Sequence, residues 1–230
     1  MNKLSHPFIT ELKRYVASQN ATLGPIILSI CDLIKYEGTL NIDETINKQR
    51  KLSQVADMIH AAHVFHRCVR DDTLETKRLH QDNIMSILVG DYLLAQSSMD
   101  IATLNPMTVG LMAKSLEDYT RGEFLRNSDL EKHAALTSGS LLSNGCLSAA
   151  LLAGHSHAND PHELSSLVRD FGLQTGIALR LLEISDKRCK NMILGYVDKS
   201  VELLLELPDG KERPQLLGTL EDMRNRSLNL

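Results

Sequence analysis

The sequence predicts an all-α protein with one domain covering residues 1–230. Apolar residues recur at helical spacing along almost the whole chain, and alternating β-branched runs between turns are scarce. With 230 residues, 43% of them hydrophobic, the chain is long enough to bury one sizeable core and too apolar for general disorder. No repeat of fixed period is visible, so a globular all-helical domain is expected.

Charge and cysteine content exclude several function classes. The formal net charge of −4 lacks the basic excess that is typical of nucleic-acid binders, so no nucleic-acid partner is expected. The four cysteines lie far apart without a CxxC pair, which makes a disulfide framework or zinc ribbon improbable. The longest apolar stretches fall well short of the roughly 20 residues that span a bilayer. A soluble protein of a reducing compartment, with no transmembrane segment, is expected.

Apolar spacing and helix-breaking residues predict where the helices lie. They are expected at about 10–19, 24–37, 46–69, 82–99, 106–125, 130–154, 160–186, 190–206 and 211–226, with a break over Gly38–Asp43. Pro25 suits a first helical turn because its missing N–H is not needed there. Asn144-Gly145 can also form a hairpin turn, but its flanks keep helical spacing and the helix is predicted to continue.

Two of these helices are expected to be buried. In the helix at 46–69, one face is apolar and carries Val55, Met58, Ile59, Ala62, Phe65 and Val69. The helix at 82–99 is apolar nearly all round, with Ile84, Ile87, Leu88, Val89, Leu93 and Leu94. That pattern predicts burial on more than one side. Periodicity does not show whether such a surface belongs to the core or to an interface with another protein.

Three segments carry a resemblance to a known family. They are VADMIHAAHVFHRCVRDD at 55–72, NIMSILVGDYLLAQSS at 83–98 and FGLQTGIALRLLEISD at 171–186. In this order and spacing they resemble the trans-isoprenyl diphosphate synthase (polyprenyl synthetase) family, best over 55–186. In active members the first segment looks like IHxxxxxHDDxxD, the second like GDxLL, and the third ends in DDxxD. The resemblance implies an isoprenoid synthase-type helical bundle, here shortened on the C-terminal side after Asp186.

The aspartates of those motifs hold the Mg²⁺ ions that neutralise a departing pyrophosphate. At the three aspartate positions the first motif of this chain reads Arg67, Cys68 and Asp71, and the second reads Glu183, Ile184 and Lys187. Arg67 puts a fixed positive charge where a metal ion would sit, which repels the ion. Both motifs are therefore degenerate, and no catalytic, cofactor-binding or metal-binding residue is expected in this chain.

Other positions that the resemblance implies are also vacant. The basic, glycine-rich diphosphate-binding stretch should precede Pro25, where the sequence is Asn20-Ala21-Thr22-Leu23-Gly24. The lysine expected ahead of the second motif corresponds to Thr137, and the arginine pair after the first motif survives at most as Lys77-Arg78. The loss of all these groups together argues against activity.

Within the family, the chain is most similar to the non-catalytic second subunits of heteromeric decaprenyl-type synthases. The resemblance implies a regulatory or stabilising partner of a catalytic polyprenyl diphosphate synthase subunit, in a heterodimer or heterotetramer. Mg²⁺ would be bound by that partner and no cofactor by this chain. Contact would use the helices at about 83–104 and 106–125. The resemblance also implies ubiquinone side-chain synthesis in mitochondria, with a cytoplasmic location as the alternative.

Two other functions stay open. One is an active Mg²⁺-dependent prenyltransferase with an altered metal site built from Asp71, Asp72, Glu183 and Asp186. The other is a homodimeric scaffold or lipid-binding module without a synthase partner.

Several histidines invite a metal site, for which a structural interpretation is preferred. His60, His63 and His66 share one helix, but His66 lies roughly 240° around from His60, so the three cannot converge. A solvated loop is expected for three more, His155, His157 and His162. Asp91 of the GDxLL segment is expected to bond a nearby helix end, and Cys68 to be a buried small residue.

Overall fold

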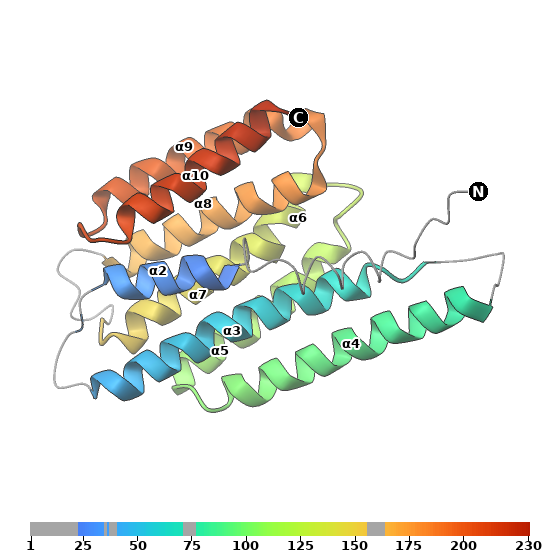
Figure 1. The fold of residues 1–230 in the computed structure, drawn as a ribbon, viewed down its shortest axis with the longest axis horizontal. Coiled ribbons are helices and arrows are strands. Elements are labelled where there is room, and N and C mark those ends of the chain that lie inside the picture. Colours follow the sequence, from blue (N-terminus) through green and yellow to red (C-terminus); the bar gives the residue numbers. More distant parts are fainter. Residues whose placement is uncertain (1–22, 35, 37–40, 71–76, 156–163) are drawn as a thin grey trace.

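The computed structural model describes residues 23–34, 36, 41–70, 77–155 and 164–230, without the side chains of 77–79 (Figure 1). All regular secondary structure in these ranges is helical, which confirms the predicted all-α class. The helix expected at 10–19 and most of the break before Asp43 lie outside the described residues.

The helices follow one another with short connections. In chain order they are α2 (Leu23–Leu33), α3 (Ile42–His66), α4 (Lys77–Ile101), α5 (Pro106–Glu123), α6 (Leu130–Ala134), the π-helical segment η1 (Ala135–Gly139), α7 (Ser140–Leu152), α8 (Leu164–Ile184), the 3-10 turn η2 (Lys187–Cys189), α9 (Lys190–Glu206) and α10 (Arg213–Leu228). Asn144 and Gly145 lie inside α7, so the helical interpretation is confirmed and the hairpin is excluded.

Asparagine side chains set two helix starts. The side chain of Asn105 accepts a hydrogen bond from Thr108 N at 2.8 Å, and α5 begins at the following proline, as expected. The side chain of Asn41 likewise accepts from Glu44 N at 3.3 Å. As a result α3 begins at Ile42, earlier than predicted, and Asp43 belongs to its first turn rather than to a break. The predicted end of this helix was also wrong, because α3 stops at His66 and Val69 is exposed.

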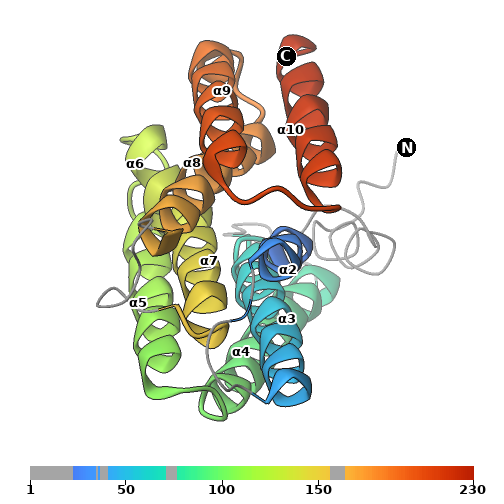
Figure 2. The ribbon, with the colours of Figure 1, turned by 90° about the vertical axis from the view of Figure 1, so that its left-hand side faces the viewer.

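Helices α7 and α8 lie at the centre of the bundle (Figures 1 and 2). On one side α8 packs against α9, which packs against α10; on the other, α7 packs against α2, α3 and α5. One connected apolar core joins these helices. The stretch Leu130–Leu152 is long and apolar enough to cross a membrane, but 78% of its most apolar part is buried inside the protein. The protein core therefore accounts for its apolar character.

Helix α4 lies at the edge of the bundle and packs mainly along α3 (Figure 2). Its inner side carries Ser86, Gly90 and Ser97, which are buried. Its other side exposes six large apolar residues by 41–67%: Ile84, Met85, Ile87, Leu88, Tyr92 and Met99. We call these six residues the α4 outer face. The expectation that this helix is buried on more than one side was wrong for the described part of the chain, in which α3 alone packs closely against it.

Candidate functional site

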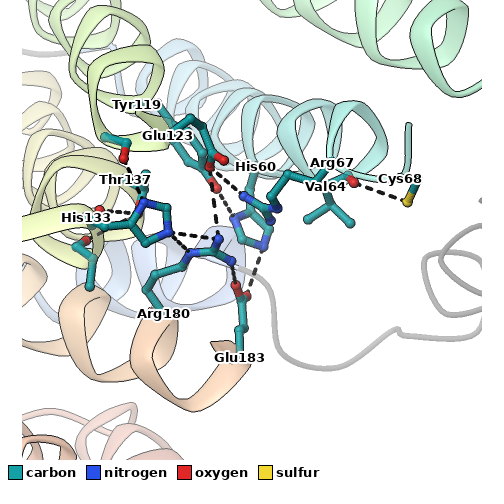
Figure 3. A network of polar contacts seen from close by, with 12 residues as sticks. His60, Val64, Arg67, Cys68, Tyr119, Glu123, His133, Thr137, Arg180 and Glu183 are labelled. Carbon is teal, nitrogen blue, oxygen red and sulfur yellow. Dashed lines mark hydrogen bonds and ion pairs between the residues drawn. The ribbon is translucent and has the colours of Figure 1, made fainter. Parts of the chain in front are cut away.

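The degenerate first motif lies where α3 ends. Arg67 follows α3 directly, and its backbone N–H donates to the carbonyl of His63 at 3.1 Å. Its side chain is mostly buried and donates from Nη1 to Oε1 of Glu123 at 2.8 Å (Figure 3). Glu123 is the last residue of α5. The guanidinium that replaces the first motif aspartate therefore bridges two helices.

The degenerate second motif begins in the last turn of α8. Oε1 of Glu183 lies 3.0 Å from Nε2 of His60 on α3, and its Oε2 lies 2.7 Å from Nη1 of Arg180 (Figure 3). The Glu183 side chain is 36% exposed, so it forms the outer edge of the site. This one carboxylate connects the two motif-bearing helices, α3 and α8.

Arg180 is the most deeply buried charge of the site, with a side chain only 5% exposed. Its Nε and Nη2 atoms lie 3.1 and 3.0 Å from Nε2 of His133 on α6. Nδ1 of His133 lies 2.8 Å from the carbonyl oxygen of Gly122, which can only accept. The proton is therefore assigned to Nδ1, and Nε2 accepts from Arg180. Burial lowers the pKa of His133, in keeping with this neutral tautomer.

His60 and His63 carry different charges although they lie on the same helix. Burial disfavours a charge on His60, but Glu183 and Tyr119 outweigh this effect and raise its pKa to about 9. Its Nδ1 lies 3.2 Å from the Tyr119 hydroxyl, so the protonated ring donates on both sides. His63 instead stacks on Tyr119 at a centroid distance of 3.9 Å, and burial lowers its pKa to about 4. At neutral pH His60 is a cation and His63 is neutral.

The two carboxylates stay charged for the same reason. Burial would raise the pKa of Glu183, but His60 and Arg180 hold it well below its ordinary value. Burial would also raise the pKa of Glu123, but the nearby Arg67 lowers it below its ordinary value. Three cations and two carboxylates thus converge, with one positive charge in excess. We call His60, Arg67, Glu123, Arg180 and Glu183 the ion-pair cluster.

This arrangement does not suit a divalent metal ion. Both carboxylates already accept hydrogen bonds from cations, and the three cations would repel a further positive charge. Mg²⁺ needs several free oxygen ligands in near-octahedral geometry. Within the described part of the chain, no group of three His, Cys, Asp or Glu side chains is placed to hold a metal ion. The residues present therefore do not fit the metal set that the resemblance implies.

Three other motif residues are described, and they lie outside the ion-pair cluster. Cys68 is buried, as expected, and its Sγ lies 3.3 Å from the carbonyl of Val64. Ile184 packs against the core, and Lys187 is exposed in η2. Asp71, and with it Asp72, lies outside the described residues.

Asp186 does not join Glu183. Its Oδ2 lies 2.6 Å from Nη2 of Arg188, which lowers its pKa to about 2. Between the two acids, α8 ends at Ile184 and Ser185 adopts a left-handed conformation with φ of 55°. The turn sends the second acid of the motif away from the first, so Glu183 and Asp186 have separate partners.

An acidic residue lies next to the segment expected to be basic. The backbone N–H of Gly24, in the first turn of α2, donates to Oδ1 of Asp57 at 2.8 Å. A Cβ atom at Gly24 would fall 2.3 Å from the same carboxylate, so a larger residue there would displace Asp57 from this contact. A carboxylate is favourable at a helix N-terminus, and it would repel a diphosphate there. Asn20, Ala21 and Thr22 lie outside the described residues.

Thr137 occupies the position where a lysine was expected. It is buried in η1, and its hydroxyl donates to the carbonyl of His133 at 2.7 Å. A Cβ atom on Gly122 of α5 would fall 2.7 Å from its methyl group, so the surroundings are closely packed. The side chains of Lys77 and Arg78 lie outside the described part of the structure.

The remaining histidines follow the sequence analysis only in part. His60 and His66 face different partners, because Nε2 of His66 lies 3.1 Å from Oδ1 of Asp91. Asp91 thus contacts the side chain of the last residue of α3 rather than capping the backbone of a helix end. The expectation of a solvated loop was wrong for His155, which is buried because the chain turns back at the end of α7 and its N–H donates to Ala150. His157 and His162 lie outside the described residues.

Four residues of the site were missed from the sequence: Tyr119, Glu123, His133 and Arg180. One signal was available for Arg180, which is the only charged residue in the apolar run TGIALRLL. A charge in such a run predicts a buried partner. One partner, Glu183, lies three residues further along the same helix, but the other, His133, comes from α6, and its identity required the fold.

Comparison with known proteins gives a consistent family of relatives. The chain is 26% identical over 203 residues to decaprenyl-diphosphate synthase of Dictyostelium discoideum (79% of this chain, 41% of the relative). It is 28% identical over 162 residues to mitochondrial solanesyl-diphosphate synthase 1 of Oryza sativa (63% and 36%). Its match to decaprenyl-diphosphate synthase subunit 2 of Schizosaccharomyces pombe is 22% identical over 229 residues (93% and 74%). The chain thus spans less than half the length of the first two relatives.

Solved structures show the same fold. The geranyltranstransferase of Methanosarcina mazei superposes with a TM-score of 0.71 at 17% identity, covering 97% of this chain and 91% of the other. No family model matches the sequence.

The ion-pair cluster predicts a stability maximum near pH 6.5. The pKa of His60 is about 9 when folded, against 6.5 for a free histidine, so its contribution to the free energy of unfolding is complete below pH 6.5 and lost as pH rises through 9. His63, with a pKa of about 4, contributes the opposite trend, so stability falls as pH drops below 6.5.

Urea unfolding between pH 5 and 10 checks this expectation. The alkaline loss should reach at most about 3 kcal/mol, since one pKa unit corresponds to about 1.4 kcal/mol. His60→Gln should remove it. An equal alkaline decline in this variant would contradict the assignment of a charged His60.

Proposed function

Because its relatives and structural neighbours are trans-prenyl and polyprenyl diphosphate synthases, we propose that this chain is the non-catalytic subunit of a heteromeric, decaprenyl-type synthase. It binds a catalytic polyprenyl diphosphate synthase subunit, which it stabilises or regulates, and Mg²⁺ is bound by that partner. The observation that carries the proposal is the ion-pair cluster. In it Arg67 is paired with Glu123 and His60 with Glu183, so neither carboxylate is free to bind a metal ion.

The chemistry of prenyl transfer supports this division of roles. An allylic diphosphate loses its pyrophosphate only when the charge on the departing group is neutralised, which Mg²⁺ ions accomplish. In this chain Glu123 and Glu183 are already neutralised by fixed cations, and Asp57 places a negative charge at the start of α2. A magnesium diphosphate therefore finds neither its ligands nor a basic cradle among the described residues.

The α4 outer face supports a role as a binding subunit. Its six apolar side chains are exposed along one helix, and Met107 at the start of α5 is exposed as well. Contiguous exposed apolar residues on a helix are typical of a surface that binds another protein. Binding there stabilises whichever partner conformation fits the surface better, so a subunit without chemistry can still raise the partner's activity.

The relatives support the finer parts of the proposal. The fission-yeast relative, by its name a second subunit of decaprenyl-diphosphate synthase, aligns with 93% of this chain. The rice relative is named as mitochondrial, and we extend that location to this chain. Supply of the ubiquinone side chain is the process that the proposal implies.

Reconstitution tests the function. Prenyl transfer would be measured with Mg²⁺ for this chain alone, for a catalytic polyprenyl diphosphate synthase chain of the same organism alone, and for their mixture. We expect no transfer by this chain and clearly higher activity in the mixture than in the catalytic chain alone. Robust transfer by this chain alone would support the altered metal site instead, while a homodimer that ignores the catalytic chain would support the scaffold.

The surface assignment has its own test in a pair of substitutions. Leu88 of the α4 outer face and Leu205 of α9 are each 56% exposed, and their helices lie on opposite sides of the bundle (Figure 1). Leu88→Arg should weaken binding of the catalytic chain at least about tenfold, because a hot-spot residue contributes about 2 kcal/mol or more. Leu205→Arg should leave it unchanged. Equal effects, measured by titration calorimetry on variants of unchanged helix content, would contradict the assignment.

A further inference from the structure

The end of α3 contacts two parts of the molecule at once. On one side, His60 and Arg67 enter the ion-pair cluster (Figure 3). On the other side, Ala61, Phe65 and Cys68 form a small apolar cluster with Val89 and Leu93 of α4. The same two helical turns therefore connect the buried charges with the helix that carries the α4 outer face.

Helix α3 reaches α5 and α8 through side chains rather than through close helix packing. Its backbone packs closely against α2, α4 and α7. Towards α5 it is held by Arg67 on Glu123 at 2.8 Å, and by His60 and His63, which both contact Tyr119. Towards α8 it is held by His60 on Glu183 at 3.0 Å. Helix α4 depends on α3 in turn, because α4 has only marginal contact with α5. The placement of α4 thus depends on where the end of α3 lies.

The contact between α3 and α4 is tight enough to transmit a shift. A Cβ atom at Gly90 of α4 would fall 2.2 Å from the ring of His66, so this side chain packs directly against the α4 backbone. The next residue, Asp91, is paired with the same ring at 3.1 Å. Closely packed contacts of this kind pass displacements on rather than absorb them.

We infer that the ion-pair cluster is a positioning device for the partner surface: Arg67 and Glu123 fix the end of α3, which holds the α4 outer face in the orientation that the catalytic subunit binds. The inference rests on the proposed function, since it concerns the regulation of the same binding surface. Arg67 is thereby a positioning residue, more than a relic of a lost metal site. The fold retains buried charges there because they orient an exposed helix.

The test removes the bridge without leaving a lone buried charge. Arg67→Met/Glu123→Gln deletes both partners, because deleting one alone would strand the other and destabilise the fold. We expect the affinity for the catalytic chain to fall about tenfold, within the usual range for coupled sites. Amide hydrogen exchange in α4 should become faster in the variant even without the partner, while helix content is retained.

The matched control is Glu44→Gln/Lys48→Met, which removes an exposed ion pair of 2.6 Å at the other end of α3. It should change neither the affinity nor the exchange in α4. If the native chain binds the catalytic chain and the double variant at Arg67 and Glu123 binds equally well, the inference is overturned while the proposed function stands. If the native chain does not bind, the proposed function fails and the docking part of the inference fails with it.

A second variant keeps the test decisive if the first does not fold. Arg67→Lys preserves the charge but not the planar guanidinium geometry. It should weaken binding of the catalytic chain by a smaller factor, with α4 exchange between the native and doubly substituted rates. Native affinity and native exchange in this variant would overturn the inference.

Discussion

The structure depends on one constraint, which is that buried charges must be paired where they lie. Glu123 and Glu183 are charged because Arg67, Arg180 and His60 surround them, and these cations are tolerated because the carboxylates are there. Deleting Glu123 would leave Arg67 without its carboxylate, and deleting Arg67 would leave Glu123 with only Arg180, 4.0 Å away. The cluster therefore joins α3, α5 and α8, and carboxylates that are already bonded to cations do not suit a further metal ion.

The chain has the helical fold of trans-prenyl and polyprenyl synthases, but the residues at the motif positions differ from those expected. The described helices form the bundle that is also seen in the solved geranyltranstransferase, with a TM-score of 0.71. In the first motif Arg67 stands where a metal-binding aspartate was expected, and Asp57 lies beside the start of α2. Among the described residues, six large apolar side chains are exposed on α4.

The sequence predicted the class, most helices and the cation at Arg67, because helical periodicity and motif spacing are local properties. It did not predict that Glu123, His133 and Arg180 converge, since these residues are 10 to 57 positions apart and only the fold brings them together. The prediction that α4 is buried on more than one side also failed. A helix that is apolar on most sides has the same sequence pattern whether it lies in the core or exposes one face to another protein. Helix ends shifted where an asparagine cap, such as Asn41, overrode the apolar pattern.

Calorimetric titration of the isolated chain with Mg²⁺ and a non-hydrolysable isoprenoid diphosphate analogue tests the central claim most directly. The ion-pair cluster predicts no saturable binding that depends on the metal, because its carboxylates are already held by fixed cations. Stoichiometric, Mg²⁺-dependent binding of the analogue would contradict the account, since it would require Glu123 or Glu183 to release its cation and take up the metal.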